Sequence, residues 1–505
     1  MPAVGLRAPS AFWYDDRATI PSSERRPKAL KPVNIGGHAA YRNALRKRLR
    51  VCYPNSKVIS ESQWRIYKKF RDLDLSPVDS IMEDKYSVFG PEPRPPSCMF
   101  RSYLLSLAFH IPGVAAWVEA MRVTPLYAIL SGFAPDDTPG VGTFYDFFDR
   151  LWDSPEKNLT NHVQPPRVKV KKPKNKGEKA DSVEKETTEE LIERLSLTDF
   201  SLDEQPYATL FSVFQACFLN QSVLRGVLSS ENLTLSGDGT PVVTSARERS
   251  HKICACGKVR CSCPRFFSQP DCDIGWDSSR NLYYSGYDLY LITDTKRDLP
   301  LFPLFHPASK HDSHGFCEAF FRFLSFLPDF KPSRLTLDSA HDVMAIYTLC
   351  QSLSLVPFID LNPRNAKKPS PESNAIQTGP DGFPVCPAGL NMKPNGADLK
   401  RRCLKFRCPR MQKGKCVCDS PCSSAKFGRT FSVPMKTNPR LYNFPPRQSW
   451  EWKKVYNART ASERANKRMK NDYHLEDGHH RSTRMWYVRL YAIVMSLHLD
   501  AWPVS

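Results

Sequence analysis

From residue 233 onward, short apolar segments of strand length alternate with longer segments of helical periodicity. The strand candidates are LTLSGDGTPVVT, NLYYSGYDLYLITD, LPLFPLFHPA, RLTLDSA and VPFIDL, and only the turn TKRD separates the second from the third. Two helical segments follow, DVMAIYTLCQSLSL and DSHGFCEAFFRFLSFL, the latter expected to be capped by Asp312 or Ser313. This alternation predicts an α/β fold with a mixed or parallel sheet and flanking helices.

Two strand candidates end in an aspartate, Asp238 in LTLSGDG and Asp338 in RLTLDSA. Because residues two apart on a strand face the same way, each aspartate lies on the face opposite the leucines of its strand. If the strands are neighbours, the two carboxylates converge at one sheet edge, where a divalent cation would relieve their repulsion. Mg²⁺ and Mn²⁺ accept such oxygen ligands and suit phosphate substrates. A single strand-ending aspartate, by contrast, more often only starts a turn.

A third acid, Glu463, lies in the segment YNARTASERANKRMK. On a helix that advances about 100° per residue, Glu463 falls within about 60° of a tyrosine, an arginine and a lysine. Such a stripe suits a site in which the carboxylate holds metal while the cations and the tyrosine grip the flanking phosphates. The candidate site residues are therefore Asp238, Asp338 and Glu463 as catalytic metal ligands and Tyr456, Arg459 and Lys470 for DNA binding.

Other acids compete for these roles. Asp342 is the alternative second acid, and we favour Asp338 because it directly ends the strand. Glu476 and Asp477 are alternative third acids, but they lack the tyrosine, arginine and lysine context and are expected to be solvated. The histidine and aspartate of KHDSH resemble a metal pair, yet their place before an apolar run predicts a helix cap.

Residues 1–155 are predicted to form a basic, mostly helical, DNA-binding module. RSYLLSLAFHIPGVAAWVEAMRVTPLYAIL has apolar residues at helical spacing, and TPGVGTFYDFFDRLWD suits a Thr-capped turn before an amphipathic helix. The basic stretch YRNALRKRLR is a flexible tail, a solvated helix or a DNA-contacting arm.

Four further segments are expected. Residues 156–195 are predicted to be a disordered, charged linker, because RVKVKKPKNK and GEKADSVEKETTEE show no apolar periodicity. The catalytic domain is expected to span 196–365, with a cysteine cluster at 251–272, and to resume at 446–505 with the glutamate-bearing helix. Residues 366–445, rich in Pro, Gly, Cys and Lys, are predicted to be a Cys-rich, basic, loop-rich insertion.

The net charge of the chain limits the kinds of binding partner that are expected. The chain of 505 residues carries 72 Lys and Arg against 52 Asp and Glu, a formal net charge of +20. Such an excess favours a polyanionic partner, chiefly nucleic acid. No segment approaches the roughly 18 uninterrupted apolar residues of a membrane span, and the start MPAVGLRAPSAFWYDD lacks the order of a secretory signal. No membrane partner is therefore expected.

Sixteen cysteines without a signal peptide favour reduced thiols and metal binding over disulfides. The segment HKICACGKVRCSC concentrates four thiols within ten residues, with His251 and Cys272 nearby, which is enough for a tetrahedral Zn²⁺ site. C-x-C pairs are less typical of zinc than C-x2-C pairs, so free cysteines in a loop are the alternative. Six later cysteines, between residues 386 and 422, could form a second zinc knuckle that faces DNA. The candidate zinc ligands are Cys254, Cys256, Cys261 and Cys263.

The segments around the three acids resemble insertion-sequence DDE transposases, mobile-element enzymes of which one branch carries the signature Y-x2-R-x3-E-x6-K. YNARTASERANKRMK fits that spacing without a gap, and SGDGT resembles the strand of the first acid. LTLDSAHD followed by VPFIDLNPR resembles the second-acid region, which usually has Asp-Ala-Gly-Tyr-Asp; Ser339, Ala340 and His341 depart from that wording. The resemblance covers roughly residues 97–152 and 230–500.

The resemblance implies a ribonuclease-H-like catalytic core and a two-step reaction. A metal-activated water cuts the end of the element, and the freed 3′-hydroxyl attacks target DNA, which suits two Mg²⁺ or Mn²⁺ ions. The implied partners are double-stranded transposon ends and target DNA, bound by a homodimer in a prokaryotic cytoplasm or nucleoid. Trp450 and Trp452 could stack on an extruded base, as an aromatic does in relatives, although ordinary packing is the expected role of both.

Two other functions share these features. A catalytically inactive, domesticated protein that binds zinc and DNA would have the same charge and cysteines, but it gains nothing from a carboxylate aimed at phosphate. A Mg²⁺-dependent DNA nuclease without strand transfer would have the same acids and would differ only in how it handles the 3′-hydroxyl.

Overall fold

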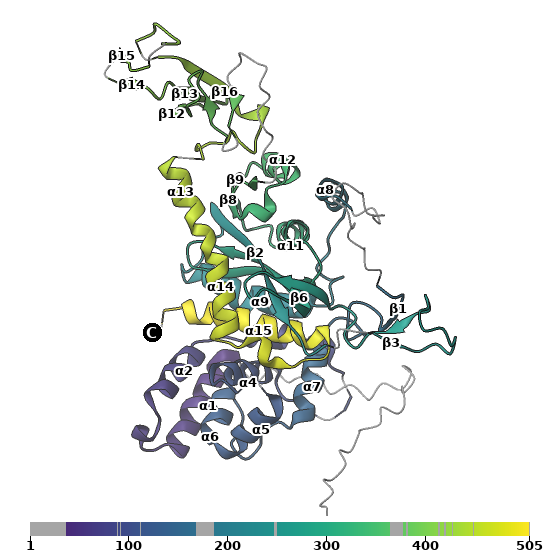
Figure 1. The fold of residues 1–505 in the computed structure, drawn as a ribbon. Coiled ribbons are helices and arrows are strands. Elements are labelled where there is room, and N and C mark those ends of the chain that lie inside the picture. Colours follow the sequence, from purple (N-terminus) through teal and green to yellow (C-terminus); the bar gives the residue numbers. More distant parts are fainter. Residues whose placement is uncertain are drawn as a thin grey trace, which may run out of the picture.

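The computed structural model describes residues 37–503 except residues 88, 91, 112, 168–185, 247–249, 364–376, 380–381, 413–414, 419–420, 427 and 448. Figure 1 shows a helical N-terminal part, a central sheet with helices packed on it, and a smaller strand-rich part beyond the sheet. Within the described residues, no helix combines the length and the apolar character that crossing a membrane requires.

The N-terminal part is helical, as its periodicity predicts. Its elements are α1 (Gly37–Cys52), a 3₁₀ turn (Ser56–Val58), α2 (Glu61–Arg71), α3 (Ser76–Ile81), a 3₁₀ turn (Glu83–Lys85), α4 (Pro96–Ala108), α5 (Val114–Val123), α6 (Pro125–Ser131) and α7 (Val141–Arg150). YRNALRKRLR lies inside α1, where Leu45 and Leu49 are buried, so it is an ordered helix rather than a flexible tail. The expected Thr cap of α7 is wrong, because Gly140 occupies the N-cap without a side-chain hydrogen bond.

The expected linker is ordered at both of its ends, which corrects the prediction there. Residues 163–164 form the short strand β1 (Val163–Gln164). Helix α8 (Thr188–Ser196) begins with a capping box between Thr187 and Glu190, and its Leu191 and Leu195 are buried. Two leucines in a charged segment are enough for this helix because α11 supplies the surface that covers them. Residues 168–185 lie outside the described residues.

The central sheet is mixed, which confirms the predicted α/β class. Its strands are β2 (Leu233–Val243), β5 (Asp273–Asp277), β6 (Leu282–Asp294), β7 (Leu299–Pro307), β8 (Pro332–Leu337) and β9 (Val356–Ile359). They run in the order β5–β6–β2–β8–β9, and β7 pairs with the later half of β6. β2 is antiparallel to β6 and parallel to β8, which is parallel to β9. This arrangement is consistent with a ribonuclease-H-like fold.

Helices cover both faces of the sheet. They are α9 (Ala208–Phe214), which continues through a π-helical segment (Gln215–Leu219) into α10 (Asn220–Leu224), then α11 (Asp312–Phe326), α12 (Met344–Ser352), α13 (Trp450–Tyr456), α14 (Thr460–Asn471) and α15 (Thr483–Ala501), with 3₁₀ turns at Ser339–His341, Asn457–Arg459 and Leu475–Gly478. α15 is buried along nearly its whole length and packs against both β7 and the N-terminal α4 (Figure 1). One continuous hydrophobic core therefore joins the N-terminal helices to the sheet.

The predicted insertion contains more β-structure than its composition suggests. Its strands are β10 (Gln377–Thr378), β11 (Pro384–Val385), β12 (Lys393–Asp398), β13 (Cys403–Arg407), β14 (Met411–Gln412), β15 (Lys415–Cys416) and β16 (Thr430–Pro434), followed by a 3₁₀ turn (Met435–Thr437). β12, β13 and β16 form an antiparallel sheet over a small separate core that includes Leu404, Phe406 and Val433. The alternation of Leu404 and Phe406 on β13 is the strand signal in this segment.

Candidate active site

Asp238 is held on β2 by a polar seam with α14. Ser236, two residues earlier and so on the same face of β2, donates to the carbonyl oxygen of Arg459 at 2.7 Å, and its Oγ lies 2.7 Å from Ser462 Oγ. Further along the seam, Asn466 Nδ2 donates to Asp238 Oδ2 at 3.1 Å. These contacts fix the start of α14 against the strand that carries the first acid.

Asp338 directly follows β8 and lies level with Asp238. In the parallel register of β2 and β8, Ser236 is opposite Thr336, so the two aspartates each lie two residues further along. Asp338 Oδ1 accepts hydrogen bonds from the Ala340 backbone N–H at 3.0 Å and from His341 Nδ1 at 2.6 Å. The structure therefore brings the two predicted acids side by side. Asp338 follows its strand as expected, but Asp238 does not end its strand, because β2 continues through it to Val243 and stays paired with β6.

Glu463 lies in the first turn of α14, above the same face of β2. Its side chain is 47% exposed, and its carboxylate pairs with Arg459 Nη1 at 2.7 Å. The helix reaches this position through a 3₁₀ turn at Asn457–Arg459 rather than as one continuous α-helix. The glutamate thus approaches the two aspartates from a helix, with one oxygen already engaged by arginine.

The electrostatics of the two aspartates differ. Burial, followed by the charges of Asp338, Asp312 and Glu463, raises the pKa of Asp238 to about 7. Burial also disfavours the charged form of Asp338, but the hydrogen bonds from the His341 side chain and the Ala340 backbone N–H hold the pKa of Asp338 below its usual range. The site thus contains one carboxylate that is stabilised by a neighbour and one whose negative charge is opposed by its neighbours.

The donor set suits a hard divalent cation. Oxygen ligands from carboxylates are those that Mg²⁺ and Mn²⁺ prefer, and a cation would relieve the repulsion that raises the pKa of Asp238. The three carboxylates do not form a closed cage. In the described part of the chain, only one group of three or more Cys, His, Asp or Glu side chains has all its ligand atoms within 4.8 Å of one another, and that group consists of cysteines. An open arrangement leaves room for more than one ion and for phosphate oxygens.

The three residues predicted to bind DNA have different surroundings. Tyr456 stacks on Trp452 with ring centroids 4.8 Å apart, and the Arg459 guanidinium lies 5.9 Å from the Tyr456 ring centroid. Lys470 is turned inward: its Nζ donates to the carbonyl oxygen of Pro241 and lies 3.6 Å from Glu476 Oε1. Arg459 therefore stays beside the acids, whereas the charge of Lys470 lies against the backbone of β2.

The two tryptophans upstream of this stripe also differ. Trp452 is 7% exposed and packs on Phe358 as well as on Tyr456, which confirms the ordinary packing role. Trp450 is 69% exposed, and Lys454 Nζ lies 5.1 Å from its ring centroid. Trp450 is thus the aromatic ring that a nucleic-acid base could reach.

The alternative acids have structural partners. Asp342 is buried, accepts two hydrogen bonds from Arg440 at 2.8 and 2.6 Å, and accepts a third from the Tyr347 hydroxyl at 3.0 Å. Glu476 is not solvated as expected: it is 22% exposed and accepts a hydrogen bond from the backbone N–H of Val243 at 3.0 Å, whereas Asp477 is 62% exposed. Because the side chains of Asp342 and Glu476 are 0% and 22% exposed, against 36% and 47% for Asp338 and Glu463, the latter two are the more accessible and remain the better candidates.

Two further aspartates approach β2 from its other face: Asp288, which the sequence analysis did not single out, and Asp312, which it assigned to a helix cap. A Cβ on Gly239 would lie 2.9 Å from Asp312 Oδ1 and 3.0 Å from Asp288 Oδ2, so this glycine makes room for both. Burial raises the pKa of Asp312, and burial with the charges of Asp312 and Asp238 raises that of Asp288 well above its usual range. In the sequence, Asp288 is marked only by being the single charged residue within the apolar run GYDLYLI. The helix cap expected in KHDSH is present, but it is His311 rather than Asp312 or Ser313.

The four clustered cysteines lie between β3 (His251–Lys252) and β4 (Arg265–Phe266). These strands pair with each other, and β4 also pairs with β1; we call residues 251–266 the cysteine arm (Figure 1). All four Sγ atoms lie within 4.8 Å of one another, and Cys254 Sγ is 3.4 Å from Cys256 Sγ. Thiolates about 2.3 Å from a tetrahedral Zn²⁺ are about 3.8 Å apart, so the group fits a structural zinc.

The other candidate zinc ligands do not join this group. Cys272 is buried and donates to a glutamine side chain, and His251 packs against a phenylalanine ring. Among the later cysteines, Cys386 and Cys408 are buried. No second cluster of three metal-ligating side chains occurs in the described regions, and the side chain of Cys416 lies outside them.

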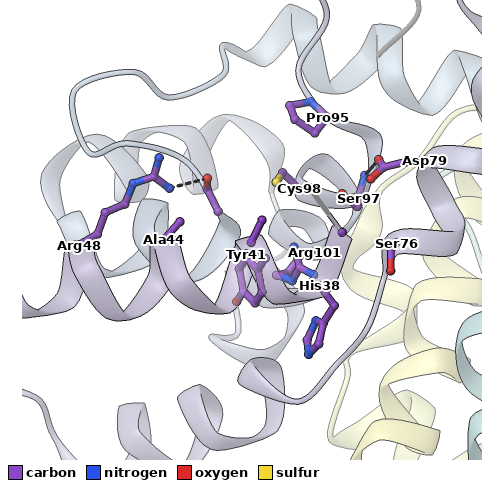
Figure 2. Close-up of a pocket in the computed structure, with 13 residues that line it drawn as sticks. His38, Tyr41, Ala44, Arg48, Ser76, Asp79, Pro95, Ser97, Cys98 and Arg101 are labelled. Carbon is purple, nitrogen blue, oxygen red and sulfur yellow. Dashed lines mark hydrogen bonds between the residues drawn. The ribbon is translucent and has the colours of Figure 1, made fainter. Parts of the chain in front are cut away.

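A cavity in the N-terminal helices is separate from these sites (Figure 2). Its lining mixes cations and serines with the Asp79 carboxylate. The Arg101 guanidinium lies 3.7 Å from the Tyr41 ring centroid, and Arg48 donates to the carbonyl oxygen of Gly132 at 2.7 Å. None of the candidate catalytic or DNA-binding residues lines this cavity, so it is not part of the carboxylate site.

The geometry can be compared with known proteins. Residues 266–499 match the family model described as the transposase DDE domain. This match supports a DDE transposase family. It includes Asp338 and Glu463 and begins downstream of Asp238. A comparison with curated proteins finds no match for the chain. A DDE transposase acts on DNA as a nucleic-acid-cleaving enzyme and uses divalent metals, which suits the oxygen donors described above.

Proposed function

We propose that the protein is a DNA transposase that cleaves DNA at the ends of a mobile element and joins those ends to target DNA. The observation that carries the proposal is the convergence of Asp238, Asp338 and Glu463 from two adjacent strands and one helix. Such acids, held together against their repulsion, suit a site that is completed by divalent metal and a phosphodiester.

Each residue has a proposed role. Divalent ions, when bound, would activate the attacking hydroxyl and stabilise negative charge on the phosphate. Asp238 and Asp338 would hold these ions from the sheet, and Glu463 would do so from α14. Arg459, paired with Glu463 at 2.7 Å, would orient that carboxylate and offer its remaining N–H groups to a flanking phosphate. Asn466 would keep Asp238 Oδ2 in place.

The proposed DNA contacts differ from those that the sequence predicts for Tyr456, Arg459 and Lys470. We propose that Arg459, Tyr456 and the exposed Trp450 contact DNA near the reacting phosphate. Lys470 is 17% exposed and bonded to β2, so we propose that it adds positive potential behind the site rather than a direct contact. This division predicts a weaker effect on DNA affinity for Lys470 than for Arg459.

The same proposal covers the remaining parts of the chain. The N-terminal module (residues 1–155) and the insertion (366–445), in which Lys and Arg outnumber Asp and Glu, would hold transposon ends and target DNA. Two copies of the chain would pair two ends, in a prokaryotic cytoplasm or nucleoid. Cys254, Cys256, Cys261 and Cys263 would hold a structural Zn²⁺.

A joining assay tests this function. Purified full-length protein is incubated with candidate element ends, Mg²⁺ and a target plasmid, and covalently joined products are scored on a gel. The proposal predicts Mg²⁺-dependent cleavage followed by joining, and ends supplied already cut, with a free 3′-hydroxyl, should join without the first step.

The same assay separates the alternatives. Cleaved ends that never join, even when pre-cut ends are supplied, would identify a nuclease without strand transfer. DNA binding without cleavage in Mg²⁺ or Mn²⁺ would identify an inactive zinc- and DNA-binding protein.

A further inference from the structure

His341 connects the second acid to a buried tyrosine of the sheet. It lies in the 3₁₀ turn directly after β8 and is 1% exposed. Its Nδ1 is 2.6 Å from Asp338 Oδ1, and its Nε2 is 2.9 Å from the Tyr290 hydroxyl oxygen. A neutral ring satisfies both contacts if Nδ1–H donates to the carboxylate and the tyrosine hydroxyl donates to Nε2.

Packing leaves the His341 ring little freedom. The Phe316 ring lies edge-on to it, with centroids 5.8 Å apart at 87°, and the Tyr290 ring lies 5.8 Å away at 70°. Tyr290 is fully buried on β6. A ring held on two sides and bonded at both nitrogens keeps one orientation.

Gly237 makes this chain of hydrogen bonds possible. A Cβ at Gly237 would lie 2.5 Å from the Tyr290 hydroxyl oxygen, closer than real contacts allow. The glycine immediately before Asp238 therefore admits the hydroxyl that holds the ring beside Asp338. The same tyrosine thus ties the strand of the first acid to the turn of the second.

The hydrogen bonds select one oxygen of Asp338. Within the described residues, both bonds that this carboxylate accepts, from Ala340 N–H and from His341, end on Oδ1. Their direction fixes the rotation of the carboxylate about its last side-chain bond. Oδ2 is then the oxygen that remains for a ligand.

We propose that His341 and Tyr290 are positioning residues that hold Asp338 Oδ1 and so present Oδ2 to a divalent cation. The proposal rests on the proposed function, because it requires Asp338 to be a metal ligand. Hydrogen-bond partners of metal ligands orient those ligands, and their loss typically weakens metal binding about 10–100-fold. Neither residue touches the substrate in this proposal.

Two substitutions at His341 test the geometry because they replace different nitrogens. In His341→Asn the amide nitrogen can occupy the place of Nδ1 and still donate to Asp338, whereas in His341→Gln it lies nearer the place of Nε2. Mn²⁺ binding to the full-length protein is measured by electron paramagnetic resonance and calorimetry, without DNA. We expect about 10–100-fold weaker binding in His341→Gln, largely restored binding in His341→Asn, and the same order in the Mg²⁺ concentration needed for half-maximal cleavage.

Controls separate positioning from folding and from the proposed function. His314→Gln on α11 should bind Mn²⁺ as the unmodified protein does, since the charged groups that surround His314 are Lys310, His311, Glu186 and Glu318 and do not include Asp338. Unchanged Mn²⁺ binding in a folded His341→Gln protein, while Asp338→Asn abolishes binding and cleavage, would overturn this inference alone. Retained cleavage in Asp338→Asn would instead overturn the proposed function.

A third variant tests the same proposal if His341→Gln does not fold. Tyr290→Phe removes only the hydroxyl that holds Nε2 of His341. Several-fold weaker Mn²⁺ binding in this variant, with unchanged thermal unfolding, supports the positioning role, and unchanged binding excludes it.

Discussion

The three carboxylates come from Asp238, Asp338 and Glu463, far apart in the chain, whereas the four thiols of the cysteine arm lie within ten residues. The carboxylate site exists only because β2, β8 and α14 meet in the folded protein, and it holds like charges together. The four thiols of the cysteine arm come from the single loop between β3 and β4, so no distant segment is needed to bring them together. Damage to the tertiary structure should therefore inactivate the carboxylate site and leave the cysteine site intact. Removal of metal from the cysteine arm should have the opposite effect.

The largest effect is expected at the carboxylates themselves. Asp238→Asn and Glu463→Gln each remove a negatively charged metal ligand. The expected loss of several kcal/mol of transition-state stabilisation corresponds to a decrease of about 10³-fold or more in the rate of Mg²⁺-dependent cleavage. DNA binding, measured by gel shift, and zinc content should remain. Gel-based cleavage rates give the comparison.

Glu451→Gln is the matched control, since Glu451 is an exposed glutamate in the first turn of the preceding helix. It should cleave as the unmodified protein does. Undiminished cleavage in Asp238→Asn or Glu463→Gln would exclude these acids from the reaction.

The second prediction concerns the ion pair beside the site. Arg440→Ala leaves the fully buried Asp342 carboxylate without its guanidinium partner, and such a loss costs about 3–5 kcal/mol in the free energy of unfolding. Urea unfolding measures this. Cleavage should fall with it, because the Asp338–Asp342 turn loosens, whereas the zinc content of the cysteine arm should not change.

A double variant checks the cause. Arg440→Met combined with Asp342→Asn removes both charges and should recover much of the lost stability. Equal instability of the single and double variants would mean that the uncompensated charge is not responsible.

The third prediction is a pH dependence at the junction of α15 and β7. His498 is fully buried, its Nε2 donates to the carbonyl oxygen of Pro300 at 2.8 Å, and burial lowers its pKa to about 4. Between about pH 6.5 and pH 4 the unfolded chain binds a proton that the folded protein excludes. Stability should therefore fall as the pH falls through this window, by about 3 kcal/mol from this group.

Urea unfolding at several pH values, compared with His498→Gln, measures this contribution. The variant keeps an amide donor for Pro300 but has no titrating ring, so its stability should depend less on pH. Identical pH profiles of the two proteins would remove His498 as the cause.

The smallest effect on the sheet is expected from the cysteine arm. Cys254→Ser with Cys261→Ser, or treatment with a chelator, should remove one zinc equivalent and expose residues 251–266 to protease. The main unfolding temperature should shift by less than about 2 °C, because the arm lies outside the main core. Metal analysis, limited proteolysis and calorimetry are the measurements.

Cys52→Ser, at an exposed cysteine in α1, serves as the control and should keep the zinc. Metal-free purified protein with an intact arm would refute the zinc site. Unfolding of the whole protein on chelation would show that the cysteine arm and the carboxylate site are not independent of each other.

Much of the fold followed from local pattern. Strand alternation identified the hairpin of β6 and β7 and placed Asp238 and Asp338 on one face, because a period of two residues is independent of tertiary contacts. Helix α15 likewise has an apolar segment of helical length, which suits its burial along nearly the whole helix. Helix α8 was missed because its two buried leucines are covered by α11 and α12, which come more than a hundred residues later.

The site was predictable in its acids but not in their supporting contacts. Spacing nominated Glu463 and Arg459, which the structure places 2.7 Å apart. The same spacing could not show that Lys470 turns toward β2, because that depends on a strand more than two hundred residues away. The approach of Asp288 and Asp312 to Gly239 is likewise set by three segments at once.

Helix α15 has a consequence for how the protein is made. It covers α4, which ends at Ala108, and β7, which ends at Pro307, yet it begins only at Thr483. At about 5–20 residues synthesised per second, the apolar face of α4 waits on the order of half a minute for the helix that buries it. During that interval these faces can pair wrongly with each other or with another nascent chain. The yield of active protein therefore depends on how they are shielded during translation as well as on the stability of the finished fold.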